Sequence, residues 1–172
     1  YALFVKHDLI NLFHIQEDKL INFLKEIESG YHPNPYHNNL HACDVTQVMH
    51  VIMSVGGLKQ YLGHEDIFAA IFASMVHDLD HPGLNNAYQV NSKSYLATLY
   101  NDRSVLENHH ISQAFELTKL AQFDIFSGLS ISQGSDIRET AIEMVLSTDM
   151  SNHTRYVNRF KARLDADADF TD

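Results

Sequence analysis

Histidines and carboxylates gather in three short segments of this sequence. They are His37 and His41, then His77, Asp78, Asp80 and His81, and then Glu107, His109 and His110. Imidazole nitrogens and carboxylate oxygens together suit zinc or another divalent transition ion. A divalent ion lowers the pKa of its bound water from about 16 to about 7 and neutralises a phosphate oxygen. Three inward ligands plus water leave a coordination position for a substrate, so we expect a catalytic metal site rather than a structural one.

The second segment follows a strongly apolar stretch. Residues 68–76, FAAIFASMV, are apolar on nearly every side, which predicts a fully buried helix that is too short to span a membrane. Pro82 takes His81 out of helical geometry, and Gly83 permits a turn. A buried element therefore delivers charged groups into the interior, where they need partners or a cation. A hydrogen-bonded turn with one inward histidine is the alternative interpretation.

The first segment opens another predicted helix, from Asn38 or Asn39 to about residue 55, because asparagine is a favourable N-cap. His41, Val45, Val48 and Ile52 follow one another at spacings of three and four, which places them on one apolar face. His41 is therefore expected to point inward. His37 lies one turn earlier, where it reaches the same cavity but stays more accessible. A core histidine bonded to a carbonyl is the alternative for His41.

The other segments are also predicted as helices and loops. Helices are expected at 3–13, 18–29, 94–99, 104–117, 136–148 and 156–164, and loops at 31–35 and 128–134. Ser104 and Glu107 have the spacing of a capping box, so capping of its own helix is the alternative for Glu107. Thr148 continues an inward stripe of the helix at 136–148, and DADADFTD at 165–172 is typical of a solvated tail. No strand pattern of useful length occurs, so we predict an all-α, compact multi-helix fold.

Composition bounds the class of protein. The 172 residues fit one domain, 1–172, and 45% hydrophobic residues exclude general disorder. A formal charge of −10 argues against a nucleic acid polymer as partner. Cys43 is the single cysteine, which indicates a reducing, cytoplasmic compartment. No signal peptide or long apolar run is visible, so this segment is expected to make no membrane contact. Fusion to a membrane domain and formation of a homodimer are both compatible with the sequence.

Four motifs, in this order, closely resemble the catalytic domain of the class I cyclic nucleotide phosphodiesterases. They are YHNNLHACDV, VHDLDHPG followed by an asparagine pair, YNDRSVLENHH and VLSTDMSNH. The resemblance implies a compact all-helical domain with two divalent metal ions, usually Zn²⁺ in the tighter position and Mg²⁺ or Mn²⁺ in the other. It also implies hydrolysis of 3′,5′-cyclic nucleotides, cAMP and/or cGMP, to 5′-monophosphates in cyclic nucleotide signalling.

The resemblance also implies roles for single residues. His37 matches the histidine that protonates the leaving 3′-oxygen. The positions of the tight metal's ligands match His41, His77 and Asp78, with the aspartate bridging to the second metal. The residues that hold the second metal's water shell and the bridging hydroxide match His81, Glu107 and Thr148. Tyr36 and Met150 match positions that line the nucleotide pocket.

One part of the family pattern is absent. The resemblance implies a further aspartate ligand and a glutamine and aromatic clamp for the base, both beyond the last motif, whereas the sequence ends at Asp172. We therefore expect the amino-terminal part of a phosphodiesterase domain, truncated before its last helices and inactive as an isolated piece. Two alternatives stay open. One is another His-Asp metallophosphohydrolase, and the other is a non-catalytic regulatory module of the same fold.

Overall fold

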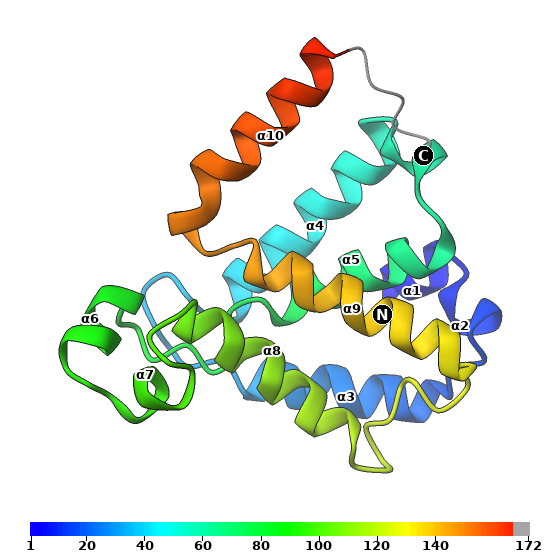
Figure 1. Ribbon diagram of the computed structural model, residues 1–172. Helices are drawn as coiled ribbons and strands as arrows, with labels where there is room; N and C mark the ends of the chain where they lie inside the picture. Colours follow the sequence, from blue (N-terminus) through cyan, green and yellow to red (C-terminus); the bar gives the residue numbers. More distant parts are fainter. Residues whose placement is uncertain (167–172) are drawn as a thin grey trace.

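The computed structural model describes residues 1–166, and this part of the chain contains helices and no strand (Figure 1). The helices are α1 (Ala2–Lys6), α2 (Leu9–Leu12), α3 (Glu17–Ser29), α4 (Asn39–Val55), α5 (His64–Val76), α6 (Asn86–Asn91), α7 (Tyr95–Leu99), α8 (Val105–Thr118), α9 (Ile131–Leu146) and α10 (His153–Asp165), with short 3₁₀ turns at Leu58–Tyr61 and Met150–Asn152. The all-α prediction is confirmed. Over residues 1–166, no helix combines the length and the apolar character that a membrane crossing requires.

The central helix is α5, which packs against α4, α8 and α9. Its residues from Ile67 to Ser74 are all buried, so the predicted buried helix is confirmed. The ring of Phe68 contacts the rings of Phe4 and Phe126 with centroids 5.5 Å apart. Side chains packed on all sides leave a helix little freedom to shift. The C-terminal end of α5, which leads into His77, is therefore held in place by the core.

The start of α5 is fixed by charge and by a backbone contact. Asp66 Oδ2 accepts a hydrogen bond from Gly63 N at 2.9 Å. Glu65 lies in the same first turn, where negative charge is favourable because the helix N-terminus is positive.

The buried face of α4 is not the predicted one. Val48 and Ile52 are 49% and 47% exposed, and the buried residues are Ala42, Thr46, His50 and Met53. The buried stripe is therefore displaced by about one residue. Thr46 is tolerated inside because its hydroxyl donates to the carbonyl oxygen of Ala42 at 2.7 Å. Because this stripe includes Thr46 and His50, the pattern of apolar residues alone does not indicate it, and tertiary packing selects it.

Three other boundaries differ from the prediction. Residues 3–13 form α1 and α2 instead of one helix, since Asp8 adopts a left-handed conformation between them. The helix α9 begins at Ile131, inside the predicted loop, because Ser130 and Gln133 form a capping box. The helix α6 lies where no helix was predicted, whereas α7 agrees with the helix predicted at 94–99 and has Ser94 as its N-cap. Of the predicted acidic tail, residues 167–172 lie outside the described residues.

Two histidines form a buried contact between the end of α1 and α4. His7 Nε2 lies 2.9 Å from His50 Nδ1, and both side chains are buried. Burial lowers the pKa of His7, and electrostatic repulsion from His50, Lys59 and Lys6 lowers this pKa further. Burial, together with Lys6, also lowers the pKa of His50. The folded state therefore favours neutral rings here.

Acid is expected to weaken the fold through this pair. Above about pH 6.5, the ordinary histidine pKa, the rings are neutral in both states and the pair contributes fully. As the pH falls below that value, the unfolded chain takes up protons that the folded chain resists, so stability is lost. We expect His50→Gln to flatten this acid dependence of the denaturant midpoint in the full-length protein. His64→Gln, which changes an exposed histidine, should keep the original dependence, and an unaltered slope in His50→Gln would contradict the explanation.

Candidate active site

A cavity of about 910 Å³ lies among the start of α4, the turn after α5, the first half of α8 and the end of α9. The structure brings every residue predicted for the site to this cavity. Its lining includes Tyr36, His37, His41, His77, Asp78, His81, Glu107, Thr148 and Met150. The helices that pack on α5 therefore assemble one polar cavity from segments that are far apart in the sequence.

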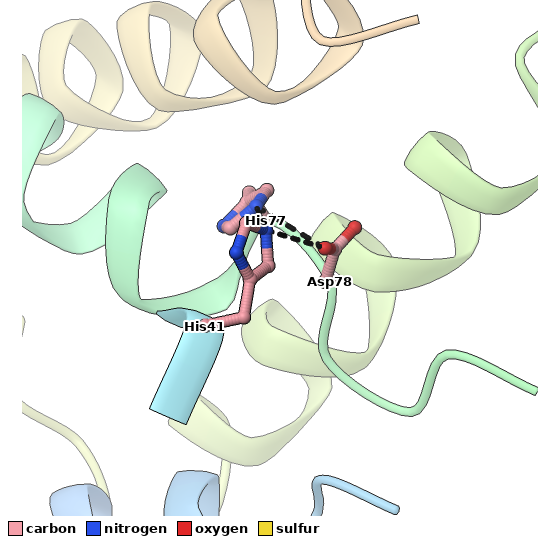
Figure 2. A group of neighbouring side chains, drawn as sticks. All are labelled: His41, His77 and Asp78. Atoms are coloured by element: carbon pink, nitrogen blue, oxygen red, sulfur yellow. Dashed lines mark hydrogen bonds and ion pairs between the residues drawn. The ribbon is translucent and has the colours of Figure 1, made fainter. Parts of the chain in front are cut away.

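Three side chains converge most closely in this cavity (Figure 2). His77 Nε2 lies 3.2 Å from Asp78 Oδ2 and 3.2 Å from His41 Nε2, and His41 Nε2 lies 3.3 Å from Asp78 Oδ2. A tetrahedral zinc ion with ligand bonds of about 2.0–2.1 Å keeps its ligand atoms about 3.3 Å apart. The spacing of these three atoms therefore fits a divalent ion.

Backbone contacts determine which ring nitrogen faces the cavity. His77 Nδ1 lies 3.0 Å from the carbonyl oxygen of Ser74 and donates to it, which leaves the lone pair on Nε2. His110 Nδ1 donates in the same way to the carbonyl oxygen of Leu79 at 2.6 Å. Metal-binding histidines commonly have such partners, because the contact fixes the tautomer and the ring orientation. Both rings are thus held with an acceptor nitrogen available.

Asp78 controls the charge in the cavity. Burial raises its pKa, but the hydrogen bond and charge of His77 outweigh burial and hold the pKa of Asp78 at about 2. Burial lowers the pKa of His77, yet the same contact with Asp78 raises it overall. Burial lowers the pKa of His81 to about 4 and that of His110 to about 3. An anionic carboxylate near the neutral imidazoles of His81 and His110 is a favourable environment for a cation.

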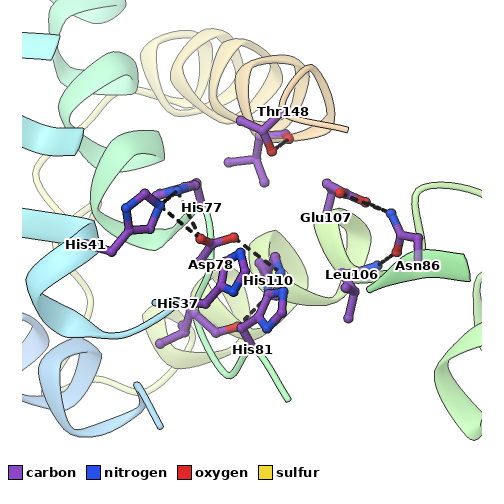
Figure 3. Close-up of polar contacts among 12 residues, drawn as sticks. His37, His41, His77, Asp78, His81, Asn86, Leu106, Glu107, His110 and Thr148 are labelled. Atoms are coloured by element: carbon purple, nitrogen blue, oxygen red, sulfur yellow. Dashed lines mark hydrogen bonds and ion pairs between the residues drawn. The ribbon is translucent and has the colours of Figure 1, made fainter. Parts of the chain in front are cut away.

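A second group of potential ligands shares Asp78 (Figure 3). Asp78, His81 and His110 each offer an atom within 4.8 Å of the others. Gly83 N donates to His81 Nδ1 at 2.9 Å, so the neutral His81 ring carries its hydrogen on Nε2. His81 is therefore suited to donate a hydrogen bond, for example to a water, rather than to ligate. The lone pair of His110 Nε2, which lies 3.8 Å from Asp78 Oδ1, is the better ligand.

His37 lies just before α4, beside this group. Its ring stacks on that of His81 with centroids 4.0 Å apart. Asn34 Nδ2 donates to the carbonyl oxygens of both residues, at 3.0 Å for His37 and 2.7 Å for His81, and so ties them together. His37 is partly exposed, while Tyr36 is 62% exposed at the rim. A histidine at a solvent-accessible edge is well placed to exchange protons.

Glu107 and Thr148 lie across the cavity from His41 (Figure 3). Ser104 makes no capping contact with α8, so the capping box predicted for Glu107 is wrong. Glu107 instead accepts from Asn86 Nδ2, at 2.8 Å for Oε2 and 3.1 Å for Oε1. Thr148 Oγ1 donates to the carbonyl oxygen of Val145 at 2.7 Å. Met150 is 74% exposed, so it lies at the rim of the cavity.

Two residues expected among the inward groups, Asp80 and His109, do not line the cavity. Asp80 has a left-handed backbone, with φ of 58°, and does not line the cavity. Its carboxylate contacts His32 Nε2 at 2.6 Å and His109 Nε2 at 2.7 Å. These contacts tie the turn after α5 to the loop before α4 and to α8. Asp80 therefore supports the turn from outside.

Sequence reasoning also missed residues that the geometry makes important. His110 was noted in its segment but was not among the predicted ligands, and its spacing of three residues from Glu107 was an available signal because both lie on one face of a helix. Asn86 was noted only as part of an asparagine pair. Its partner Glu107 is 21 residues away, and no local spacing indicates that contact.

Comparisons with known proteins agree with this geometry. The sequence model of the 3′5′-cyclic nucleotide phosphodiesterase family matches residues 36–172. A mouse protein named dual specificity calcium/calmodulin-dependent 3′,5′-cyclic nucleotide phosphodiesterase 1B is 42% identical over 166 residues, which are 95% of this chain and 31% of the relative. The chain thus spans about a third of the length of that curated relative.

Solved structures agree as well. Two crystal structures of the phosphodiesterase domain of a rhodopsin phosphodiesterase from the choanoflagellate Salpingoeca rosetta superpose with TM-scores of 0.91 at 33% identity. Each match covers 94% of this chain, and 50% and 49% of the two solved chains. The resemblance inferred from the four motifs is confirmed. The chain belongs to the 3′5′-cyclic nucleotide phosphodiesterase family.

Proposed function

We propose that the protein hydrolyses 3′,5′-cyclic nucleotides, cAMP and/or cGMP, to 5′-monophosphates. The observation that carries this proposal is the convergence of His41, His77 and Asp78, whose ligand atoms lie 3.2–3.3 Å apart in a cavity also lined by His37. Because the chain spans less than two thirds of its relatives, the activity is proposed for the full-length protein.

The proposal includes two divalent ions. Zn²⁺ would be held by His41, His77 and Asp78, because two imidazole nitrogens and one carboxylate oxygen suit zinc. Mg²⁺ or Mn²⁺ would lie at the other oxygen of Asp78, where His110 also contributes. When bound, such ions supply a nucleophile from water near neutral pH and offset the negative charge of a phosphate.

The protein's own side chains would carry the proton and orient the reactants. His37 would protonate the leaving 3′-oxygen, and its stacking on His81 supports this role because the ring is held at the cavity edge. Hydrogen bonds donated by His81 and accepted by Thr148 and Glu107 would hold waters in the cavity. Tyr36 and Met150, both exposed at the rim, would contact the nucleotide.

We also propose a cytoplasmic location, where cyclic nucleotides act as signals. Cys43 is exposed and unpaired, which is typical of a reducing compartment.

Removing metal from the full-length protein tests the proposed function. We expect chelation to reduce cAMP and cGMP hydrolysis to background, and Zn²⁺ together with Mg²⁺ or Mn²⁺ to restore it. Chromatography should identify the product as the 5′-monophosphate rather than the 3′ isomer. Nucleoside triphosphates serve as control substrates. Faster turnover of these triphosphates, or hydrolysis that survives chelation, would overturn the proposal.

A further inference from the structure

Asn86 connects the start of α8 to the cavity, although it belongs to α6. Its Oδ1 accepts from Leu106 N at 2.9 Å, and its Nδ2 donates to Glu107 Oε2 at 2.8 Å (Figure 3). A single amide thus uses its acceptor and its donor on two neighbouring residues. This arrangement fixes the orientation of the amide and, through it, of the carboxylate.

The first of these contacts is structural. The N–H groups in the first turn of a helix have no partner within the helix. Ser104 occupies the N-cap position of α8 but has a left-handed backbone, with φ of 40°, and no side-chain cap contact. Its hydroxyl donates instead to Asp149 Oδ2 at 2.7 Å. Asn86 therefore supplies an acceptor that α8 does not supply itself.

The second contact concerns the cavity. Glu107 is partly buried and lines the cavity together with Asp78 and Asp149, whose charges repel its own. Burial raises the pKa of Glu107, and the hydrogen bond from Asn86 opposes that change. Each carboxylate oxygen has further lone pairs. The contact therefore holds Glu107 in one orientation and leaves it able to accept from waters.

We propose that Asn86 is a positioning residue, which orients the Glu107 carboxylate for the reaction in the cavity. The catalytic part of this inference rests on the proposed function, whereas the contact between the two side chains does not. Partners of this kind typically change activity or metal affinity by about 10–100-fold when they are removed.

Asn86→Asp separates the two contacts. The aspartate keeps an oxygen for Leu106 N, but it replaces the donor with a second negative charge beside Glu107. At mildly alkaline pH, which favours the charged form of both carboxylates, we expect kcat for cyclic nucleotides to fall about 10–100-fold, while KM changes little. If Asn86 only capped α8, Asn86→Asp would turn over at the original rate.

Asn85→Asp is the matched control. Asn85 is the N-cap of α6, and its Oδ1 accepts from Tyr88 N at 2.9 Å. Aspartate caps a helix as well as asparagine, so this contact survives the change. The control adds the same charge one residue away and contacts Glu107 in neither form. Asn85 also lines the cavity but makes no contact with Glu107, so we expect the kcat of Asn85→Asp to fall much less than that of Asn86→Asp.

A second measurement, on the metal-free full-length protein, does not depend on activity. Glu107→Gln combined with Asn86→Asp exchanges donor and acceptor, so the hydrogen bond can form again. We expect Asn86→Asp alone to lower the thermal midpoint by about 2–4 °C or more, and the double variant to recover most of that loss without recovering kcat. Failure of Asn86→Asp to fold, with folding regained in the double variant, would show the same coupling.

The outcomes distinguish this inference from the proposed function. Additive midpoint losses in the double variant, or an unchanged kcat in Asn86→Asp, would overturn the positioning role. If the full-length protein hydrolyses no cyclic nucleotide, the proposed function fails. In that case the midpoints still decide whether Asn86 holds Glu107.

Discussion

Replacing His77 with alanine should abolish cyclic nucleotide hydrolysis by the full-length protein. His77 Nε2 lies 3.2 Å from both His41 Nε2 and Asp78 Oδ2, so its removal takes away one of the three atoms of the proposed ligand set. The substitution also leaves the buried, anionic Asp78 carboxylate without its contact to the His77 ring. A divalent ion is worth several kcal/mol of charge stabilisation, so the loss should be on the order of 10³-fold or more.

Metal analysis and a rate assay check this expectation together. His77→Ala should contain less zinc than the original protein after dialysis against buffered metal. His64→Ala changes an exposed histidine at the first position of α5, the helix that ends just before His77, and it should keep both metal and activity. A circular dichroism spectrum establishes that each variant is folded. Activity of His77→Ala at the original level would refute the metal assignment.

Replacing His37 with glutamine should reduce turnover while leaving the bound metal in place. His37 makes none of the closest contacts among the proposed ligands, and its ring lies at the cavity edge against His81. General acid catalysis typically contributes about 10²–10⁴-fold, because the leaving oxygen is a poor leaving group until it is protonated. We expect kcat of His37→Gln to fall within that range.

A change of substrate supplies the control for this prediction. An aryl phosphodiester with a nitrophenolate leaving group needs no proton, so His37→Gln should hydrolyse it nearly as well as the original protein does. Equal losses with both substrates would argue against a proton donor. Loss of metal from His37→Gln would instead mean that the residue has a structural role.

The central part of this fold could be predicted from the sequence because its signals are local. The run of apolar residues from Phe68 to Val76 is typical of a buried helix, and Pro82 and Gly83 set the turn that follows. The spacing of His37 and His41 at the start of a capped helix is equally local. These features place the two predicted ligand segments at helix ends, and the structure brings both to one cavity.

The rest could not be predicted because it depends on tertiary contacts. The buried stripe of α4 through Met53 includes Thr46 and His50, so the periodicity of apolar residues favoured the stripe through Ile52 instead. The left-handed backbone of Ser104, which prevents the capping box, has no signature in its residue type. Asp80 was expected inside on the same reasoning as Asp78, and only the positive φ of its backbone turns it outward.

The contact between His77 Nδ1 and the Ser74 carbonyl has an evolutionary consequence. That carbonyl is among the last four of α5, which lack partners inside the helix. The same hydrogen bond therefore finishes the helix and aims the imidazole. A mutation that weakens this hydrogen bond therefore affects both the end of α5 and the orientation of the His77 ring. Mutations that fray this end of the helix during evolution should weaken metal binding before they unfold the domain.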